Sequence, residues 1–531
     1  MKRGISLLLG FCLLVSPALY GDEYTGLAAF DAIHYEIILE LKETADSLKG
    51  KTRILFESRE QGPKRLALDF PDLTVDRVGV DGAEAAFDRS EGRVNISLRE
   101  AYKPGERFWV EVEYQGQPID GLFIKKNKFG NRTVFADNWP DRARHWFPCI
   151  DHPSDKATVE FFVTAPAKYD LVANGALIET TNRPEGAKLT HWRESVPIPT
   201  YCMVIGAAEF SIINVGKWND IQLSYYVYPK DRERALKDFG RALQMLEFYT
   251  SLIGPYPYEK LALVQSSTRF GGMENSSSIF FDEQAFNGTG RLEGVVAHEI
   301  AHQWFGDSVT ESDWHDLWLS EGFASYFENV FFERADGRDR FVAMMLADRD
   351  RYLKAYGADP KPIYDPSIKD LFQLLNRNNY EKGGWVLHML RRVMGDEKFF
   401  AGIRDYYRTH RDGNSSTDEL RKVMEFHAGR PLDWFFRQWV FEPGYPVYDA
   451  TWRWDESSRQ VTLKIRQRQD RTLFRMPLDV EFDLGKTRRR EVVEMKDREQ
   501  TITLKLEGKP LAVALDPDEW VLKVATVAEE K

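Results

Sequence analysis

The sequence has 531 residues, too many for a single hydrophobic core, so we expect about two to four domains. Its 43% apolar and 29% charged residues are typical of a folded protein and exclude a chain dominated by disorder or low complexity. The formal net charge of -11 argues against nucleic acid as a partner, because a negative surface repels phosphates.

The N-terminal segment 1–21 has the pattern of a signal peptide, with a basic start, an apolar run over 5–15 and small residues near its end. We expect cleavage after Ala18 or Gly21. A membrane anchor is disfavoured, because the run is shorter than the roughly 20 residues of a spanning helix and is broken at Pro17. The mature protein is therefore expected in the periplasm or outside the cell, without stable membrane insertion.

The three cysteines leave two further questions open. Lipidation at Cys12 would make the chain a lipoprotein, but bulky Phe11 fits a lipidation site poorly, so this ranks second. After processing, Cys149 and Cys202 remain, and an oxidising compartment permits a disulfide between them. Two separate buried thiols are at least as compatible with the sequence.

Residues 22–230 are expected to form a β-rich N-terminal domain. Apolar and polar residues alternate in segments such as 35–41, 93–98 and 108–114, and turn residues separate these segments.

Around residue 231 the apolar spacing becomes helical, so we expect a mainly helical domain over 231–445. The segment 291–306 is predicted to be a largely apolar, buried helix that ends at Gly306. Further helices are expected over 318–335 and 380–395, and another after a capping box formed by Ser416 and Glu419.

Alternation returns after residue 445, and we expect a small C-terminal β-sandwich over 446–531. Its strands are predicted within 461–467, 478–484, 501–506 and 512–516.

The main chemical motif is the HExxH sequence of residues 298–302. Residues four apart lie on one face of a helix, so His298 and His302 can converge on one metal ion while Glu299 is turned toward the cleft. A chance surface motif is disfavoured, since burying these three polar side chains in an apolar helix without partners is costly.

Catalytic zinc usually takes three protein ligands and leaves one position for water. Glu321, separated from His302 by eighteen residues, is predicted to complete a His-His-Glu set. It stands among apolar residues, where an ionised carboxylate needs a cation. Zinc suits two imidazoles and a carboxylate, although the sequence does not exclude another divalent metal.

A second motif, GGMEN, occupies residues 271–275. Its paired glycines, Gly271 and Gly272, allow another backbone to approach closely. Glu274 beside them could pair with a charged amine.

Together these motifs resemble those of the zinc aminopeptidase family that includes aminopeptidase N and leukotriene hydrolase. The resemblance covers nearly the whole mature chain and implies a multidomain α+β fold: an N-terminal β-domain, a thermolysin-like, mainly helical catalytic domain and a small C-terminal β-sandwich. The segments that carry it are RHWFPCIDHPSDKATVEF, PTYCMVIGAAEF, PYPYEKLALVQ, GGMEN, HEIAHQWFGD, LWLSEGFASYFE, YEKGGWVLHML and GYPV.

The resemblance implies a zinc-dependent aminopeptidase acting on peptides with a free amino terminus. It makes Glu299 the general base for a metal-bound water and Tyr380 the donor to the oxyanion. It assigns the substrate's α-ammonium to Glu274. The ligands of one zinc ion per chain would be His298, His302 and Glu321, and Gly271, Gly272 and Met273 would offer backbone groups to the peptide.

One part of the family pattern is different here. A polar residue, often Gln or Glu, usually completes the amine site from the N-terminal domain. Alignment places Asn138 or Trp139 opposite it, depending on a one-residue gap, and Asp137 is a further candidate. The preferred first residue therefore does not follow from the sequence.

Three other functions compete with this interpretation: a thermolysin-like endopeptidase, an epoxide hydrolase like leukotriene hydrolase, and an inactive relative that binds peptides. GGMEN disfavours the first, and the expected export and three-domain layout disfavour the second. The presence of all predicted ligands and the base disfavours the third. The sequence gives no indication of the oligomeric state.

Overall fold

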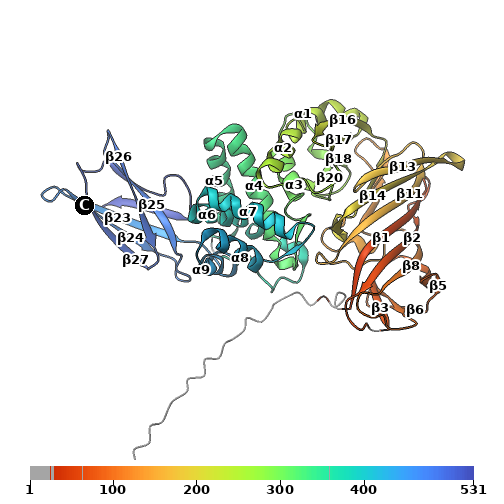
Figure 1. The fold of residues 1–531 in the computed structure, drawn as a ribbon. Coiled ribbons are helices and arrows are strands. Elements are labelled where there is room, and N and C mark those ends of the chain that lie inside the picture. Colours follow the sequence, from red (N-terminus) through yellow and green to blue (C-terminus); the bar gives the residue numbers. More distant parts are fainter. Residues whose placement is uncertain (1–23, 25–28, 63, 358, 531) are drawn as a thin grey trace, which may run out of the picture.

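The computed structural model describes residues 24, 29–62, 64–357 and 359–530. Figure 1 shows β-sheets at one end of an elongated molecule, helices in its middle and further sheets at the opposite end. This arrangement confirms the predicted multidomain α+β fold.

An eight-stranded sheet forms the larger part of the N-terminal region. In β1 the apolar side chains of Tyr35, Ile37 and Leu39 are buried, and the residues between them are more exposed, as the alternation predicts. Across the sheet the strands are β13 (Ala176–Arg183), β14 (Ala187–Pro199), β11 (Lys156–Pro166), β1 (Phe30–Leu41), β2 (Leu48–Ser58), β8 (Arg107–Gly116), β4 (Thr74–Val80) and β5 (Ala83–Glu84).

Two smaller sheets complete this region. In the second of them, strand β10 is followed directly by the segment 137–139, which faces the helical region. One sheet contains β3 (Arg65–Asp69), β7 (Arg93–Ser97) and β6 (Phe87–Ser90). The other contains β12 (Asp170–Ala173), β15 (Ile205–Ala208), β10 (Arg132–Ala136) and β9 (Leu122–Lys126).

A five-stranded sheet joins strands from both sides of the expected domain boundary at residue 230. Strands β16 and β17 precede the boundary, but β17 pairs in parallel with β18, which follows it. Sequence alternation cannot reveal such partners, since a crossover separates them along the chain. In order the strands are β16 (Ser211–Trp218), β17 (Ile221–Val227), β18 (Lys260–Ser266), β20 (Ser278–Asp282) and β19 (Gly272–Met273).

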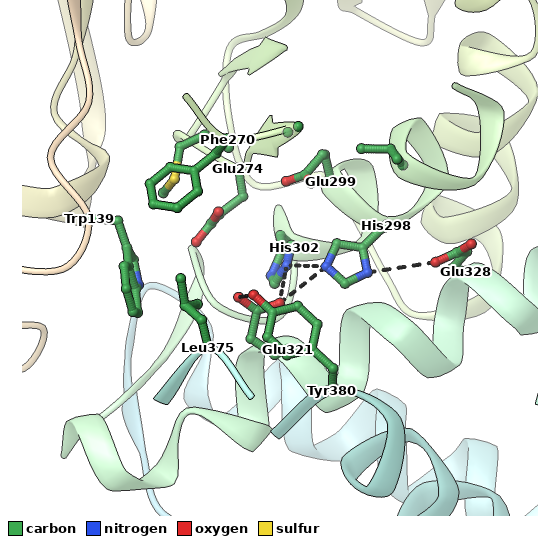
Figure 2. A pocket seen from close by; sticks show the side chains of 14 residues that line it. Trp139, Phe270, Glu274, His298, Glu299, His302, Glu321, Glu328, Leu375 and Tyr380 are labelled. Atoms are coloured by element: carbon green, nitrogen blue, oxygen red, sulfur yellow. Dashed lines mark hydrogen bonds and ion pairs between the residues drawn. The ribbon is translucent and has the colours of Figure 1, made fainter. Parts of the chain in front are cut away.

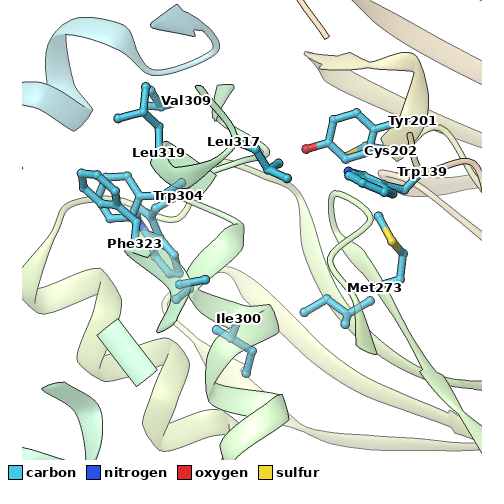
Figure 3. Packing of buried hydrophobic residues seen from close by; sticks show 14 of the residues in the cluster. Trp139, Tyr201, Cys202, Met273, Ile300, Trp304, Val309, Leu317, Leu319 and Phe323 are labelled. Carbon is cyan, nitrogen blue, oxygen red and sulfur yellow. The ribbon is translucent and has the colours of Figure 1, made fainter. Parts of the chain in front are cut away.

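The helical region packs around α3 and α4, which contribute Ile300 and Phe323 to the buried apolar side chains drawn in Figure 3. Helix α3 ends at His302, four residues before the predicted end at Gly306, because the chain turns over residues 303–308 before it enters β21 (Val309–Glu311). The helices are α1 (Arg232–Asp238), α2 (Ala242–Leu252), α3 (Glu293–His302), α4 (Trp318–Asp336), α5 (Arg338–Tyr356), α6 (Gly383–Met394), α7 (Asp396–His410), α8 (Thr417–Ala428) and α9 (Asp433–Phe436). A two-stranded sheet contains β21 (Val309–Glu311) and β22 (Gly413–Ser415).

Helices α4 and α6 approach closely through glycine. A Cβ atom added at Gly383 would lie 2.9 Å from the Cα atom of Gly322, so neither position has room for a side chain. Gly322 directly follows Glu321, and this contact therefore fixes the backbone that presents a predicted metal ligand. At the start of α8 the predicted capping box of Ser416 and Glu419 is confirmed.

The C-terminal region consists of two sheets, as predicted for a β-sandwich. Leu463 and Ile465 of one sheet and Leu478 and Val480 of the other are buried. The first sheet contains β27 (Glu499–Lys505), β24 (Gln460–Gln467), β23 (Val447–Asp455) and β29 (Val524–Glu529). The second contains β26 (Arg488–Met495), β25 (Met476–Asp483) and β28 (Ala512–Leu515).

The predicted signal peptide and Cys12 lie outside the described residues. In the part of the chain that the structure describes, we find no helix with the length and apolar character of a membrane span. Cys149 and Cys202 are two separate buried thiols and do not form the disulfide that the sequence left open.

We predict that Gly383→Ala lowers the temperature of thermal unfolding by about 2–10 °C, because overpacking against a rigid backbone costs about 1–3 kcal/mol. The matched control is Gly384→Ala in the same helix, where the added Cβ atom would be 3.6 Å from its nearest neighbour. Differential scanning calorimetry should show little change for this control. Equal destabilisation of both variants would contradict the close contact.

Candidate active site

Three side chains from two helices meet in one cavity (Figure 2). His298 and His302 lie four residues apart on α3, and Glu321 lies in the first turn of α4. The Nε2 atoms of the two histidines are 3.0 Å apart. Oε2 of Glu321 lies 3.2 Å from Nε2 of His298 and 3.3 Å from Nε2 of His302. The structure thus brings all three predicted metal ligands together.

This triangle of donor atoms fits a tetrahedral metal ion. Ligands placed at about 2.0–2.2 Å from zinc in a tetrahedron lie about 3.3–3.6 Å from one another, close to the observed separations. Two imidazole nitrogens and one carboxylate oxygen are also a donor set that zinc prefers. The residues present therefore fit the predicted cofactor.

Each histidine has a further polar group behind it that orients its ring. Nδ1 of His302 lies 3.0 Å from the carbonyl oxygen of Phe305 and 3.1 Å from the hydroxyl of Ser320. Nδ1 of His298 lies 3.7 Å from Oε2 of Glu328. Such partners leave Nε2 of both rings directed at the metal position.

Glu328 was not predicted from the sequence, although a periodic signal was present. Glu328 follows Glu321 by seven residues, two turns of α4, so both carboxylates lie on the same helical face. Helical spacing from a predicted ligand would have selected it.

The ligands also shift one another's proton affinities. Burial raises the pKa of Glu321, but the charge of His302 and hydrogen bonds from both histidines outweigh burial and lower it well below its ordinary value. Burial lowers the pKa of His302, but the carboxylates of Glu321 and Glu274 outweigh it and raise this pKa to about 9. Because coordination requires neutral imidazoles, binding of a divalent cation would release protons from this site.

Glu299, the predicted base, lies in the same cavity and is 5% exposed. Burial raises its pKa to about 8. Its place depends on Gly272, where an added Cβ atom would be 2.2 Å from Oε1 of Glu299. The close approach expected of the paired glycines thus occurs at Gly272, whereas a Cβ atom at Gly271 would meet nothing within 4 Å.

Tyr380 enters the cavity from a short π-helix, η9 (Asn378–Lys382). Its hydroxyl donates a hydrogen bond to Oε1 of Glu321 at 2.7 Å, and its ring stacks near His298 with centroids 6.0 Å apart. Burial raises the pKa of Tyr380 well above its ordinary value, so the group remains a hydrogen-bond donor at neutral pH.

Glu274 follows β19 and lines the cavity beside the histidines. Its backbone oxygen accepts a hydrogen bond of 2.6 Å from the side chain of Gln303, the residue after His302. The same amide accepts a hydrogen bond of 2.8 Å from the backbone N–H of Ser277. Gln303 thereby ties the GGMEN segment to the end of the histidine-bearing helix. Burial raises the pKa of the Glu274 carboxyl.

The structure also shows where the candidates from the N-terminal domain lie. Asn138 points away from the cavity, since its amide donates to the carbonyl of Met203 at 2.7 Å. Asp137 accepts a hydrogen bond of 2.5 Å from Arg142. Trp139 lines the cavity instead, and the sequence analysis did not anticipate the apolar residues beside it. These are Phe270, Val295 and Leu375.

Two family profiles match the chain, one described as the peptidase M1 N-terminal domain over residues 31–202 and one as the peptidase family M1 domain over 237–439. The second contains the histidine pair, Glu321 and Tyr380. The chain belongs to peptidase family M1. The resemblance to this zinc aminopeptidase family that the motifs indicated is therefore confirmed.

Individual relatives of this M1 chain differ in length and in name. Tricorn protease-interacting factor F2 of Thermoplasma acidophilum is 29% identical over 72% of the chain, which spans 50% of that relative. Leucyl aminopeptidase of Saccharolobus solfataricus is 27% identical over 90% of the chain, which spans 62% of that relative. The chain thus spans between half and two thirds of the length of these relatives.

A solved structure, the M1 zinc metallopeptidase of Deinococcus radiodurans, matches more completely. It has a TM-score of 0.68 at 26% identity, and the match covers 78% of this M1 chain and 94% of that one.

We predict that Glu328→Gln weakens zinc binding about 10- to 100-fold, because the neutral amide no longer polarises and orients His298. Competition with a chromogenic chelator measures the affinity without any substrate. Glu247→Gln on α2, which removes an exposed carboxylate, is the matched control. Unchanged zinc affinity in the Glu328 variant, with a normal unfolding temperature, would remove this residue from the site.

Proposed function

We propose that this chain is a zinc-dependent aminopeptidase that hydrolyses the first peptide bond of peptides with a free amino terminus. One observation carries the proposal: the amine-binding candidate shares the cavity with the predicted metal ligands and base. A carboxylate oxygen from each of Glu274 and Glu299 and a ring nitrogen of His302 all lie within 4.8 Å of one another. An α-ammonium group on Glu274 would therefore place the adjacent carbonyl next to the metal position.

His298, His302 and Glu321 would hold one zinc ion per chain. When bound there, zinc supplies an acidified water molecule and polarises the scissile carbonyl. Burial of His302 and Glu321 supports this assignment, because an uncompensated carboxylate would be costly in this position.

Glu299 would act as the general base by accepting a proton on its carboxylate and passing it to the leaving amine. The raised pKa of this carboxyl supports the role, since a base that must also act as an acid works best near the ambient pH. Tyr380 would turn its hydroxyl from Glu321 toward the oxyanion that develops on the substrate.

The peptide backbone would bind along β19, which contains Gly272 and Met273. This strand pairs with β20 on one side and is the last strand of its sheet, so its other edge is available to an added strand. Gly271, Gly272 and Met273 would then offer backbone groups to the substrate, while Glu274 at the end of the strand binds its amine.

Export is a further part of the proposal. Residues 1–21 would direct the chain to the periplasm or out of the cell and then be removed. Sequencing the amino end of the mature protein tests this, with a start at Leu19 or Asp22 expected and a start at residue 1 contradicting it.

We predict that the zinc-loaded protein cleaves a short peptide with a free amino end and loses this activity by at least about 100-fold when the same peptide is N-acetylated. Acetylation removes the charge that Glu274 is proposed to bind, and one charge-assisted contact contributes about 1.5–3 kcal/mol besides its effect on positioning. Chromatography of both peptides after incubation measures the two rates.

Glu299→Ala is the control, with zinc retained and turnover reduced about 100- to 10,000-fold. Equal cleavage of both peptides, with bonds cut internally, would indicate an endopeptidase. No cleavage of any free peptide by the zinc-loaded protein would indicate an inactive relative.

A further inference from the structure

Four apolar side chains line one side of the cavity, and we refer to Trp139, Phe270, Met273 and Leu375 as the apolar wall. Figure 2 shows Trp139, Phe270 and Leu375 on the side of Glu274 that faces away from His298. A substrate whose amine binds Glu274 would have this wall within reach of its first side chain, because Glu274 and the four apolar residues line the same cavity.

Trp139 is the part of the wall that comes from the N-terminal domain, and it is 2% exposed. Its ring makes edge contacts with Trp314 and Phe372 at centroid distances of 5.8 and 5.7 Å. Its carbonyl oxygen accepts a hydrogen bond of 2.8 Å from Nε of Arg142. The indole is therefore held in place before any ligand binds, and it can act as a fixed boundary of the cavity.

The apolar wall disfavours ionised first side chains. Among the described residues, no lysine or arginine lines the cavity, so an acidic side chain on the wall would lose its hydration without gaining a cationic partner there. The guanidinium of Arg269 lies over the rings of Phe270 and Phe372, 5.1 and 4.8 Å from their centroids. The charge of Arg269 is offset by the Asp137 carboxylate, 3.8 Å away, and a basic side chain on the wall would lose its hydration just as an acidic one would.

We infer that the apolar wall binds the first side chain of the substrate and that Trp139 is the residue that restricts this position to neutral, apolar side chains. This inference rests on the proposed function and names its substrate class: peptides that begin with residues such as leucine, methionine or phenylalanine. The cavity, with a volume of about 360 Å³, has room for them.

Aminoacyl arylamides of Ala, Leu, Phe, Glu and Lys test the inference in the zinc-loaded wild-type protein. The expected kcat/KM for Leu and Phe exceeds that for Glu and Lys by at least about 10- to 100-fold, the effect of burying one large apolar side chain. Equal values, or a preference for Glu or Lys, would overturn the inference and leave the proposed aminopeptidase function intact.

Trp139→Ala identifies the residue responsible. We expect kcat/KM for the Leu and Phe substrates to fall about 10- to 100-fold, while that for the Ala substrate changes less than about threefold, because only large side chains reach the indole. Trp454→Ala, which removes an indole from β23 on the C-terminal sheet, is the matched control and should change none of the ratios. An equal loss on all substrates from Trp139→Ala would overturn the assignment.

A second variant tests the inference if Trp139→Ala does not fold, and a binding measurement tests it if the protein shows no turnover. Trp139→Phe keeps an apolar ring, so it should fold even if the alanine variant does not, and it should lower the Leu-to-Ala ratio of kcat/KM. Calorimetric titration of the zinc-loaded Glu299→Ala protein with leucine amide and glutamic acid α-amide needs no catalysis. Tighter binding of leucine amide would support the inferred role of the apolar wall even if the proposed function fails. Equal binding of the two amides would overturn that role.

Discussion

Five of the ionisable side chains that line the cavity lie close together, and their mutual electrostatics constrain the structure around them. Glu274, Glu299 and Glu321 bring three carboxyl groups into contact with His298 and His302, which are only two bases. Without a cation the cluster retains protons, as the raised pKa values of Glu299 and His302 show. A divalent ion supplies the missing charge, and a peptide's amino group can supply one more positive charge beside it.

The fold holds this cluster partly through glycine positions where a side chain would clash with neighbouring atoms. Gly272 lets the backbone of β19 pass against Glu299, and Gly322 lets α4 pack on α6 immediately after Glu321. Gln303 bonds the GGMEN segment to the end of α3. The proposed metal position, base and amine site are thus held by three direct contacts between neighbouring elements.

The sequence predicted those parts of the site that depend on local spacing. The histidine pair follows from helical periodicity, and the same periodicity would have selected Glu328. The choice between Asn138 and Trp139 could not be made, because a one-residue gap in a loop turns a different side chain toward the cavity. Similarly, the β-rich and helical segments were predictable, but the pairing of β17 with β18 across residue 230 was not, since it joins strands that are distant in sequence.

The proposed function depends on the binding of one metal ion by His298, His302 and Glu321. Anomalous diffraction from crystals of the zinc-loaded protein, recorded above and below the zinc absorption edge, tests it most directly. We expect one strong anomalous peak per chain, about 2.0–2.2 Å from Nε2 of both histidines and from a carboxylate oxygen of Glu321. Zinc bound elsewhere in a fully loaded protein, with these three side chains free of metal, would contradict it.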